Sequence, residues 1–325
     1  MLPIQPIQSF EQLKLLADTR RLAILRILMA GPASLTQIGM TLGEHPAWVR
    51  HHLKQLETAG LVELVETKIE SGVVEKFYCA RAGGFLLQQV ILPDNPSHPT
   101  IVFSGSHDLA VELLAEKLSS HISLLTMPVG SLDGLVSLRQ NLCQVSGCHL
   151  LDADGDYNLP FVRRFFPDRA MHMVTLAHRE QGLIVAPGNP KNIRNLSDLA
   201  RAEITFVNRN PGSGTRLWLD RQLAAHSIAA ESIRGYDTVV STHTECAAAV
   251  QRGAADVGIG LHASAVRCGL SFVPLFHERY DLVLPQEQSE RLNPILDTIQ
   301  TGEFRRSVKA LTGYETTHTG EQIPI

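Results

Sequence analysis

The spacing of apolar positions in the first part of the chain predicts four helices followed by a β-hairpin. Apolar residues recur at helical intervals in four stretches, 10–16, 22–30, 34–42 and 46–59. Asp18 can cap the second stretch, Pro46 suits the first turn of the fourth, and Gly60 can end it. Two strand-type runs, 61–66 and 73–78, flank the turn residues Ser71-Gly72. This order of elements predicts an α+β winged helix-turn-helix domain.

The fourth helix divides into a buried face and an outward face. Val49, Leu53 and Leu56 share one side, which we expect to pack on the core. The outward positions, which we predict to bind DNA, are Ala47, Trp48, Arg50, His51 and Lys54. Arg50, His51 and Lys54 could reach bases or phosphates in the major groove. Lys68 and Lys76 of the hairpin could contact the DNA backbone. The alternative is a solvated helix face in a winged helix that binds only protein.

Charge is evenly balanced over the chain. The formal net charge is −4, and residues 1–90 hold nine Lys and Arg against eight Asp and Glu. A basic DNA-binding surface must therefore come from the arrangement of the cations and not from their excess.

The remaining chain repeats one pattern, an apolar strand, a turn with Ser, Thr or Gly, and a helix. Three prolines in 92–100 predict a semi-rigid linker, which separates domain 1–91 from domain 101–325. The four repeated turns lie at 104–108, 130–134, 208–216 and 241–245. In an α/β fold such turns converge at the carboxyl edges of parallel strands, where open sheets bind ligands. The alternative is four capped helices with no common ligand.

The turn at 208–216 has the layout of an anion site. Helix N-termini present unpaired N–H groups, and Gly212 and Gly214 would let the backbone approach a ligand. Ser213 and Thr215 could donate hydrogen bonds, and Arg209 or Arg216 could supply full charge. The same residues also suit an ordinary capped helix start.

Two longer segments, 181–187 and 272–284, are predicted to connect two lobes. The first lobe would comprise about 101–182 and 275–325, and the second about 183–274.

Residues 52–62, His-Leu-Lys-Gln-Leu-Glu-Thr-Ala-Gly-Leu-Val, resemble the end of the recognition helix of ArsR-type winged-helix regulators. Residues 18–25 resemble the helix opening of that family. The resemblance covers about 10–82 and implies binding to double-stranded DNA and a homodimer. Many such proteins sense metals through cysteines on the helix before the recognition helix, but 34–42 contains none. We therefore place the sensor in the second domain and expect no metal site.

The second domain, over about 100–313, resembles a type II periplasmic-binding-protein-like domain with two α/β lobes. The resemblance is carried by 105–108, 129–131, 149–152, 182–190, 208–216, 253–258 and 278–282. The spacing of Arg209, Ser213 and Thr215 is also similar to the ligand loop of tungstate-binding transport proteins. Asn210-Pro211-Gly212 stands where acidic residues are common in that loop.

The resemblance to tungstate-binding proteins implies a small oxyanion as ligand, and molybdate or tungstate is the leading candidate. A tetrahedral dianion needs hydrogen-bond donors on all sides and few carboxylates nearby. We expect Asp108, Asp133 and Glu245 to cap helices, and His107, His149 and His243 to be hydrogen-bonded structural groups. Tyr280 could serve the hinge or the ligand. The candidate ligand-binding residues are Ser106, Ser131, Arg209, Ser213, Gly214, Thr215, Thr244 and Tyr280.

These features predict a one-component transcriptional regulator without a cofactor. No nucleophile–base pair stands out, so we expect no enzyme activity. The alternatives are a sensor of a small organic anion or cofactor precursor, and an enzyme of prephenate-dehydratase-like or porphobilinogen-deaminase-like type on the same fold. The first residues do not form a secretory signal, and the apolar run 22–29 is too short to span a membrane. With five scattered cysteines, the sequence predicts a cytoplasmic protein.

Overall fold

The computed structural model describes residues 4–7, 9–70, 73–87, 90–93, 97–152 and 154–325. The chain forms two compact units, Met1–Ile91 and Leu92–Ile325. The hairpin turn Ser71-Gly72 and residues 94–96 of the expected linker lie outside the described residues.

The first unit contains the four helices that the apolar spacing predicts. They are α1 (Phe10–Leu16), α2 (Thr19–Ala30), α3 (Leu35–Leu42) and α4 (Pro46–Thr58). The Asp18 carboxylate accepts from the N–H of Arg20 and so caps α2. Ser34 and Gln37 form a capping box at the start of α3. The expected buried face of α4 is confirmed, because Val49, Leu53 and Leu56 lie in the core of this unit.

A small antiparallel sheet completes the winged helix. Its strands are β2 (Ala33–Ser34), β3 (Val62–Glu70) and β4 (Val73–Ala80), in the order β2-β4-β3. The sequence analysis did not anticipate a parallel pair formed by β1 (Ile4–Pro6) and β5 (Gly84–Leu86). This pair ties the two ends of the unit together.

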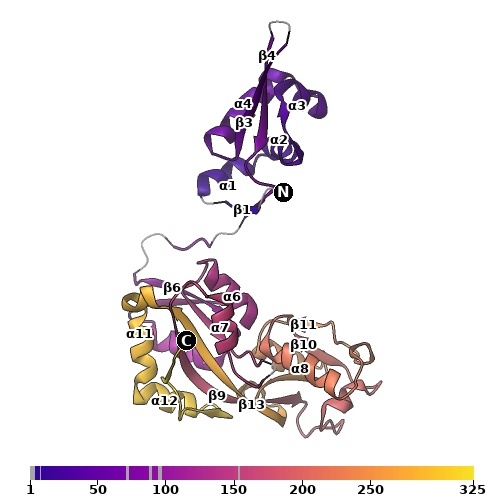
Figure 1. Cartoon of the computed structure of the whole chain (residues 1–325). Helices are drawn as coiled ribbons and strands as arrows, with labels where there is room; N and C mark the ends of the chain where they lie inside the picture. The colour runs from indigo at the N-terminus through magenta and orange to yellow at the C-terminus, as the bar shows by residue number, and fades with distance from the viewer. Residues whose placement is uncertain (1–3, 8, 71–72, 88–89, 94–96, 153) are drawn as a thin grey trace. The chain divides into compact units, whose positions relative to one another are not determined.

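The second unit is built on one mixed sheet of ten strands. Eight strands follow the order β11-β10-β12-β9-β13-β8-β6-β7. Two of them, β9 (Met171–Val185) and β13 (Ser271–Pro285), are 15 residues long, pair antiparallel and pass from one lobe to the other (Figure 1). β13 includes the predicted connecting segment 272–284, and β9 includes residues 181–185 of the predicted segment 181–187.

Each lobe has the expected parallel strand-to-helix units. Lobe one holds β6 (Thr100–Gly105), β7 (Ser123–Pro128) and β8 (Val145–Cys148), with α5 (Leu109–Leu118), α6 (Ser131–Arg139), α7 (Leu159–Phe165), α11 (Ser289–Gln300) and α12 (Gly302–Lys309). Lobe two holds β10 (Phe206–Arg209), β11 (Val239–Val240) and β12 (Val257–Leu261), with α8 (Gly214–Ala225), α9 (His243–Gln251) and α10 (His262–Arg267). Each lobe has an apolar core, and the core of lobe one also takes in Leu261 and Ala263 from β12 and α10.

The last strands of the chain pair with β9, one of the two strands that connect the lobes. Two short strands, β14 (Tyr314–Glu315) and β15 (Gln322–Ile323), pair with β9. Among the described residues, no helix combines the length and apolar character needed to cross a membrane.

Candidate functional site

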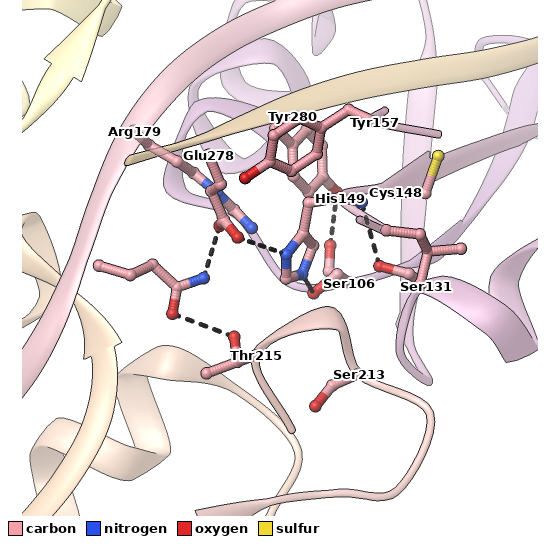
Figure 2. Close-up of polar contacts among 12 residues, drawn as sticks. Ser106, Ser131, Cys148, His149, Tyr157, Arg179, Ser213, Thr215, Glu278 and Tyr280 are labelled. Atoms are coloured by element: carbon pink, nitrogen blue, oxygen red, sulfur yellow. Dashed lines mark hydrogen bonds and ion pairs between the residues drawn. The ribbon is translucent and has the colours of Figure 1, made fainter. Parts of the chain in front are cut away.

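His149 is the centre of a buried polar network between the lobes. It follows β8, and its Nδ1 lies 2.7 Å from Glu278 Oε2 while its Nε2 lies 2.8 Å from Ser106 Oγ (Figure 2). The backbone N–H of His149 donates to Ser131 Oγ over 3.2 Å. One side chain thus joins the turn after β6, the start of α6 and the hinge strand β13.

Glu278 collects hydrogen bonds from several directions. Arg179 Nε donates to Glu278 Oε1 over 2.6 Å, and the Gln181 amide donates to the same oxygen. The Arg179 guanidinium also pairs with Asp108, which caps α5 as expected. Burial opposes ionisation of Glu278, but Arg179 and the donors around it hold the pKa of Glu278 at about 2. The Glu278 carboxylate can therefore only accept.

This fixes the direction of the hydrogen bonds in the network. Because Glu278 only accepts, His149 Nδ1 must carry a hydrogen. Burial lowers the pKa of His149, so the ring is neutral and its Nε2 accepts from the Ser106 hydroxyl. Similarly, the Gln181 amide nitrogen is used by Glu278, and the Thr215 hydroxyl donates to Gln181 Oε1 over 3.0 Å. The hydroxyl hydrogens that Ser106 and Thr215 were expected to offer to an anion are thus engaged within the protein.

Three other expected ligand residues have different surroundings. Ser131 accepts from His149, which leaves its hydroxyl hydrogen available for a ligand. The Tyr280 hydroxyl donates to the Ser106 carbonyl over 2.5 Å, and its ring lies 4.3 Å from the Arg179 guanidinium. Ser213 caps α8 by accepting from the Arg216 N–H over 3.3 Å, and it donates to the Asn210 carbonyl. Ser213 thus has the capping role that was the alternative interpretation of this motif.

The two lobes are in contact through their glycine-containing turns. The Asn210 side-chain amide donates to the Val129 carbonyl over 2.9 Å, and the Leu132 N–H donates to the Gly212 carbonyl over 3.3 Å. Gly214 packs directly on His149. A cavity of about 30 Å³, lined in part by these two residues, remains beside the contact. This volume is enough for about one water molecule, so the lobes are closed.

Arg209 has an unusual environment at the end of β10. Its side chain is buried, with 1% of the residue exposed, and it forms no ion pair with any described residue. One guanidinium nitrogen donates to the Ser241 carbonyl over 2.8 Å, but Nε and the other terminal nitrogen find no acceptor among the described residues. Burial lowers the pKa of Arg209 to about 10, so the side chain keeps its charge at neutral pH.

Further polar atoms without partners belong to His243, which lies within the electrostatic influence of Arg209, to the next residue Thr244, and to His107 beside the His243 ring. In the described part of the chain, neither ring nitrogen of His243 has a partner, nor does the Thr244 hydroxyl or His107 Nδ1. The rings of His107 and His243 lie 6.3 Å apart. Burial, followed by the charges of Arg209 and Arg179, places the pKa of His243 well below its usual value. We call Arg209, His243, Thr244 and His107 the unpartnered cluster.

His243 corrects one expectation. The sequence analysis predicted hydrogen-bonded structural roles for three histidines. His149 has such a role, and His107 Nε2 lies 2.9 Å from Glu112 Oε1. His243 does not have such a role, although it is fully buried at the start of α9. Thr242 and Glu245 form a capping box there, so the helix start is capped without the imidazole. A buried polar group left without a partner is destabilising.

The winged helix presents most of its expected DNA-binding residues to solvent. Ala47, Arg50, His51 and Lys54 are exposed on α4. Trp48 is half-buried, and its ring lies 4.4 Å from the buried ring of His52. It thus packs against the core while the other four face outward.

Lys68 and Lys76 are both exposed but lie on opposite faces of the hairpin. Lys68 is paired in register with Glu75, and Lys76 with Thr67. Paired residues share a face and successive residues alternate. The hairpin therefore cannot present both lysines to DNA from one face.

Two models of protein families match the chain, one in each unit. A model of the PBP superfamily domain matches residues 111–300, and a model of a helix-turn-helix domain matches residues 16–65. The chain belongs to the PBP superfamily. It joins a helix-turn-helix domain to a two-lobed PBP domain, an organisation that indicates a transcriptional regulator with a ligand-binding domain.

Individual proteins show the same likeness. The chain is 34% identical over 239 residues to the uncharacterized protein YvgK of Bacillus subtilis (strain 168), covering 73% of this chain and 77% of that protein. It is 31% identical over 108 residues to an uncharacterized protein from the 5′ region of a 2Fe-2S ferredoxin gene of Clostridium pasteurianum, covering 32% of this chain and 96% of that protein. An ABC transporter substrate-binding protein from Clostridium perfringens, solved with bound phosphate, aligns with a TM-score of 0.49 and 17% identity over 66% of this chain and 99% of its own.

Within the PBP domain, sequence reasoning located the turns but missed the residues between them. Arg209 and Thr244 were named and lie in the unpartnered cluster, whereas Ser106, Ser131, Gly214, Thr215 and Tyr280 lie around His149. The network residues Arg179 and Gln181 were not named as candidates, nor was Tyr314, whose hydroxyl donates to Asp108 Oδ2 over 2.7 Å. One available signal was the polar triplet 179–181, which with His178 makes the longest polar run of a mostly apolar strand. Such a triplet in a buried strand indicates polar residues that need partners.

Proposed function

We propose that the protein is a one-component transcriptional regulator whose PBP domain closes on a small oxyanion. The observation that carries this proposal is the buried, charged Arg209 side chain, which lacks a carboxylate partner among the described residues. An isolated buried charge is strongly unfavourable unless an opposite charge compensates it. An anion in the closed cleft would supply that charge.

The surroundings of Arg209 favour an anion without hydrogens of its own. Arg209 has two N–H groups without acceptors in the described chain, and the Thr244 hydroxyl adds a donor. The nearby carboxylates of Asp108 and Glu278 are held by Arg179, so they do not compete for the cluster. Molybdate and tungstate fit such a lining because they are fully deprotonated near neutral pH and accept hydrogen bonds only.

Closure of the lobes would couple the anion to DNA. A ligand shifts a conformational equilibrium only if it binds the two forms with different affinity. An anion held between residues of both lobes meets this condition, because opening the cleft would separate its donors. We propose that two chains act as a homodimer and that α4 binds in the major groove, with Arg50, His51 and Lys54 facing the DNA.

Thermal unfolding with added oxyanions tests the ligand assignment. The full chain would be heated with millimolar molybdate, tungstate, sulfate or phosphate, beside an Arg209→Met variant. A ligand that binds only the folded form raises the unfolding temperature. We expect molybdate or tungstate to stabilise the wild-type chain and to leave the variant unaffected. Stabilisation by none of the four anions, or equal stabilisation of both proteins, would contradict the proposal.

A further inference from the structure

The proposed function leaves open what His243 does in the unpartnered cluster. We infer that His243 contacts the bound anion directly and takes up one proton from solvent when the anion binds. This inference rests on the proposed function, because it concerns the same site.

The ring of His243 has no hydrogen-bond partner among the described residues. The ring is buried at the first residue of α9, and an added Cβ at Gly260 of β12 would lie 3.3 Å from its Nδ1. Glu245, on the same helix, is turned toward the backbone, where it accepts from the N–H groups of Ser241 and Thr242 over 2.8 and 3.1 Å. The imidazole is therefore enclosed by protein but not hydrogen-bonded to any described part of it.

The groups that face His243 from neighbouring elements are mostly cationic or neutral. Arg209 ends β10, Arg179 lies on β9, and His107 and His149 follow β6 and β8. Cys246, one turn further along α9, is a neutral thiol because burial raises its pKa to about 12. Glu278 lies within the influence of Arg209 but is already bound by Arg179 and His149. Without an anion, these surroundings keep the His243 ring neutral.

The hydrogen-bonding inventory of imidazole gives the reason for a protonation step. A neutral ring carries one N–H donor and one lone-pair acceptor, whereas a protonated ring carries two donors. A fully deprotonated oxyanion offers acceptors only. One small anion reaches only one of the two nitrogens, because their hydrogen-bond directions diverge. The hydrogen bond from that nitrogen is stronger when the ring is protonated and charged. His149 cannot play this part, since both its ring nitrogens already have partners.

Charge balance in the closed cleft points the same way. Arg209 carries one buried charge that no described carboxylate pairs with, since Asp108 and Glu278 are bound by Arg179. A dianion would neutralise Arg209 and leave one negative charge. Protonation of His243 would offset that charge. The two arginines lower the pKa of His243, and the negative charge of the anion would raise it.

Isothermal titration calorimetry can count the proton. The full chain would be titrated with molybdate, tungstate and sulfate at pH 7 in two buffers that differ in ionisation enthalpy. These anions carry no titrating proton near pH 7, so a buffer-dependent heat reports protonation of the protein. We expect uptake of about one proton and an affinity that rises up to about tenfold for each pH unit of acidification. Binding without proton uptake would overturn the inference while leaving the proposed function intact.

Two glutamine variants assign the proton to a residue. His243→Gln keeps a polar side chain that cannot be protonated, so we expect proton uptake to vanish and affinity to fall about tenfold or more. His226→Gln, at an exposed position after α8, is the control and should keep both values. Unchanged uptake in His243→Gln would also overturn the inference. If none of the three anions binds the wild-type chain, the proposed function fails and this inference fails with it.

Discussion

Gly214 of lobe two approaches His149 of lobe one so closely that a Cβ atom would stand 2.4 Å from the His149 carbonyl oxygen and 2.6 Å from its Nδ1. Real Cβ atoms essentially never lie this close to backbone or ring atoms. The closed lobes therefore require glycine at the start of α8. The same residue places Thr215 within reach of Gln181 on the hinge strand.

Replacing Gly214 by alanine should prevent full closure and weaken anion binding. Crowding a packed contact costs about 1–3 kcal/mol, which corresponds to a loss in affinity of about tenfold or more. Gly302→Ala is the control, because its Cβ would meet only the end of the Arg306 side chain, at 3.3 Å. Titration calorimetry with molybdate measures both variants. Equal affinity of Gly214→Ala and wild type would show that closure does not need this contact.

The two buried arginines should respond in opposite ways to replacement by methionine. Arg179→Met leaves Asp108 and Glu278 without their cation, and we expect it to lower the free energy of unfolding by about 3–5 kcal/mol. Arg209→Met removes a charge that has no ion-pair partner in the described chain. It should leave the stability of the ligand-free protein unchanged or raise it by about 1 kcal/mol. Urea unfolding without added anions measures both. A strong loss of stability in Arg209→Met would indicate that a protein group already compensates this arginine.

Acid should destabilise the PBP domain through Glu278. The pKa of this carboxyl is depressed to about 2 in the folded protein from a usual value of 4.5. A depressed pKa contributes stability above the unfolded value and loses it as the pH falls toward the folded value. We expect the contribution of Glu278 to disappear between about pH 4.5 and pH 2. Urea unfolding of wild type and Glu278→Gln across this range tests it, since the variant should show a weaker pH dependence.

Alanine at Arg50 or Lys54 should weaken binding to the protein's own promoter. Each side chain is exposed on α4, and loss of one base or phosphate contact should reduce affinity about tenfold. Arg26→Ala makes the same charge change at an exposed position of α2 and is the control. Fluorescence anisotropy at several salt concentrations should also show a salt dependence lower by about one ion for a lost phosphate contact. Unchanged binding in both α4 variants would contradict the assignment of α4 as the DNA-binding helix.

Local signals in the sequence were sufficient to predict the elements and the turns. Asp18, Ser34 and Asp108 cap helices because their short side chains reach the free N–H groups of the next residues. The turn at Arg209 was found because a strand, a glycine-rich segment and a helix follow one another in the chain. Each of these signals involves residues within a few positions of each other.

The pairing of distant residues could not be predicted in the same way. Arg179 and Glu278 are 99 positions apart and meet because they lie directly opposite each other in the antiparallel pair of β9 and β13. The hydroxyl directions of Ser106 and Thr215 depend in turn on that carboxylate. Similarly, the faces of Lys68 and Lys76 follow from a register shift in the hairpin between Leu64 and Glu66. A one-residue shift exchanges the faces of a strand, and no local pattern reveals it.

A crystal structure of the protein grown with tungstate tests the central claim most directly, because tungsten is located by its anomalous scattering. The account predicts an anomalous peak in the closed cleft, with the oxygens of the anion in hydrogen-bonding distance of the Arg209 guanidinium and the His243 ring. A structure in which the lobes are closed and water or a protein group fills this cluster, with tungsten elsewhere or absent, would contradict it.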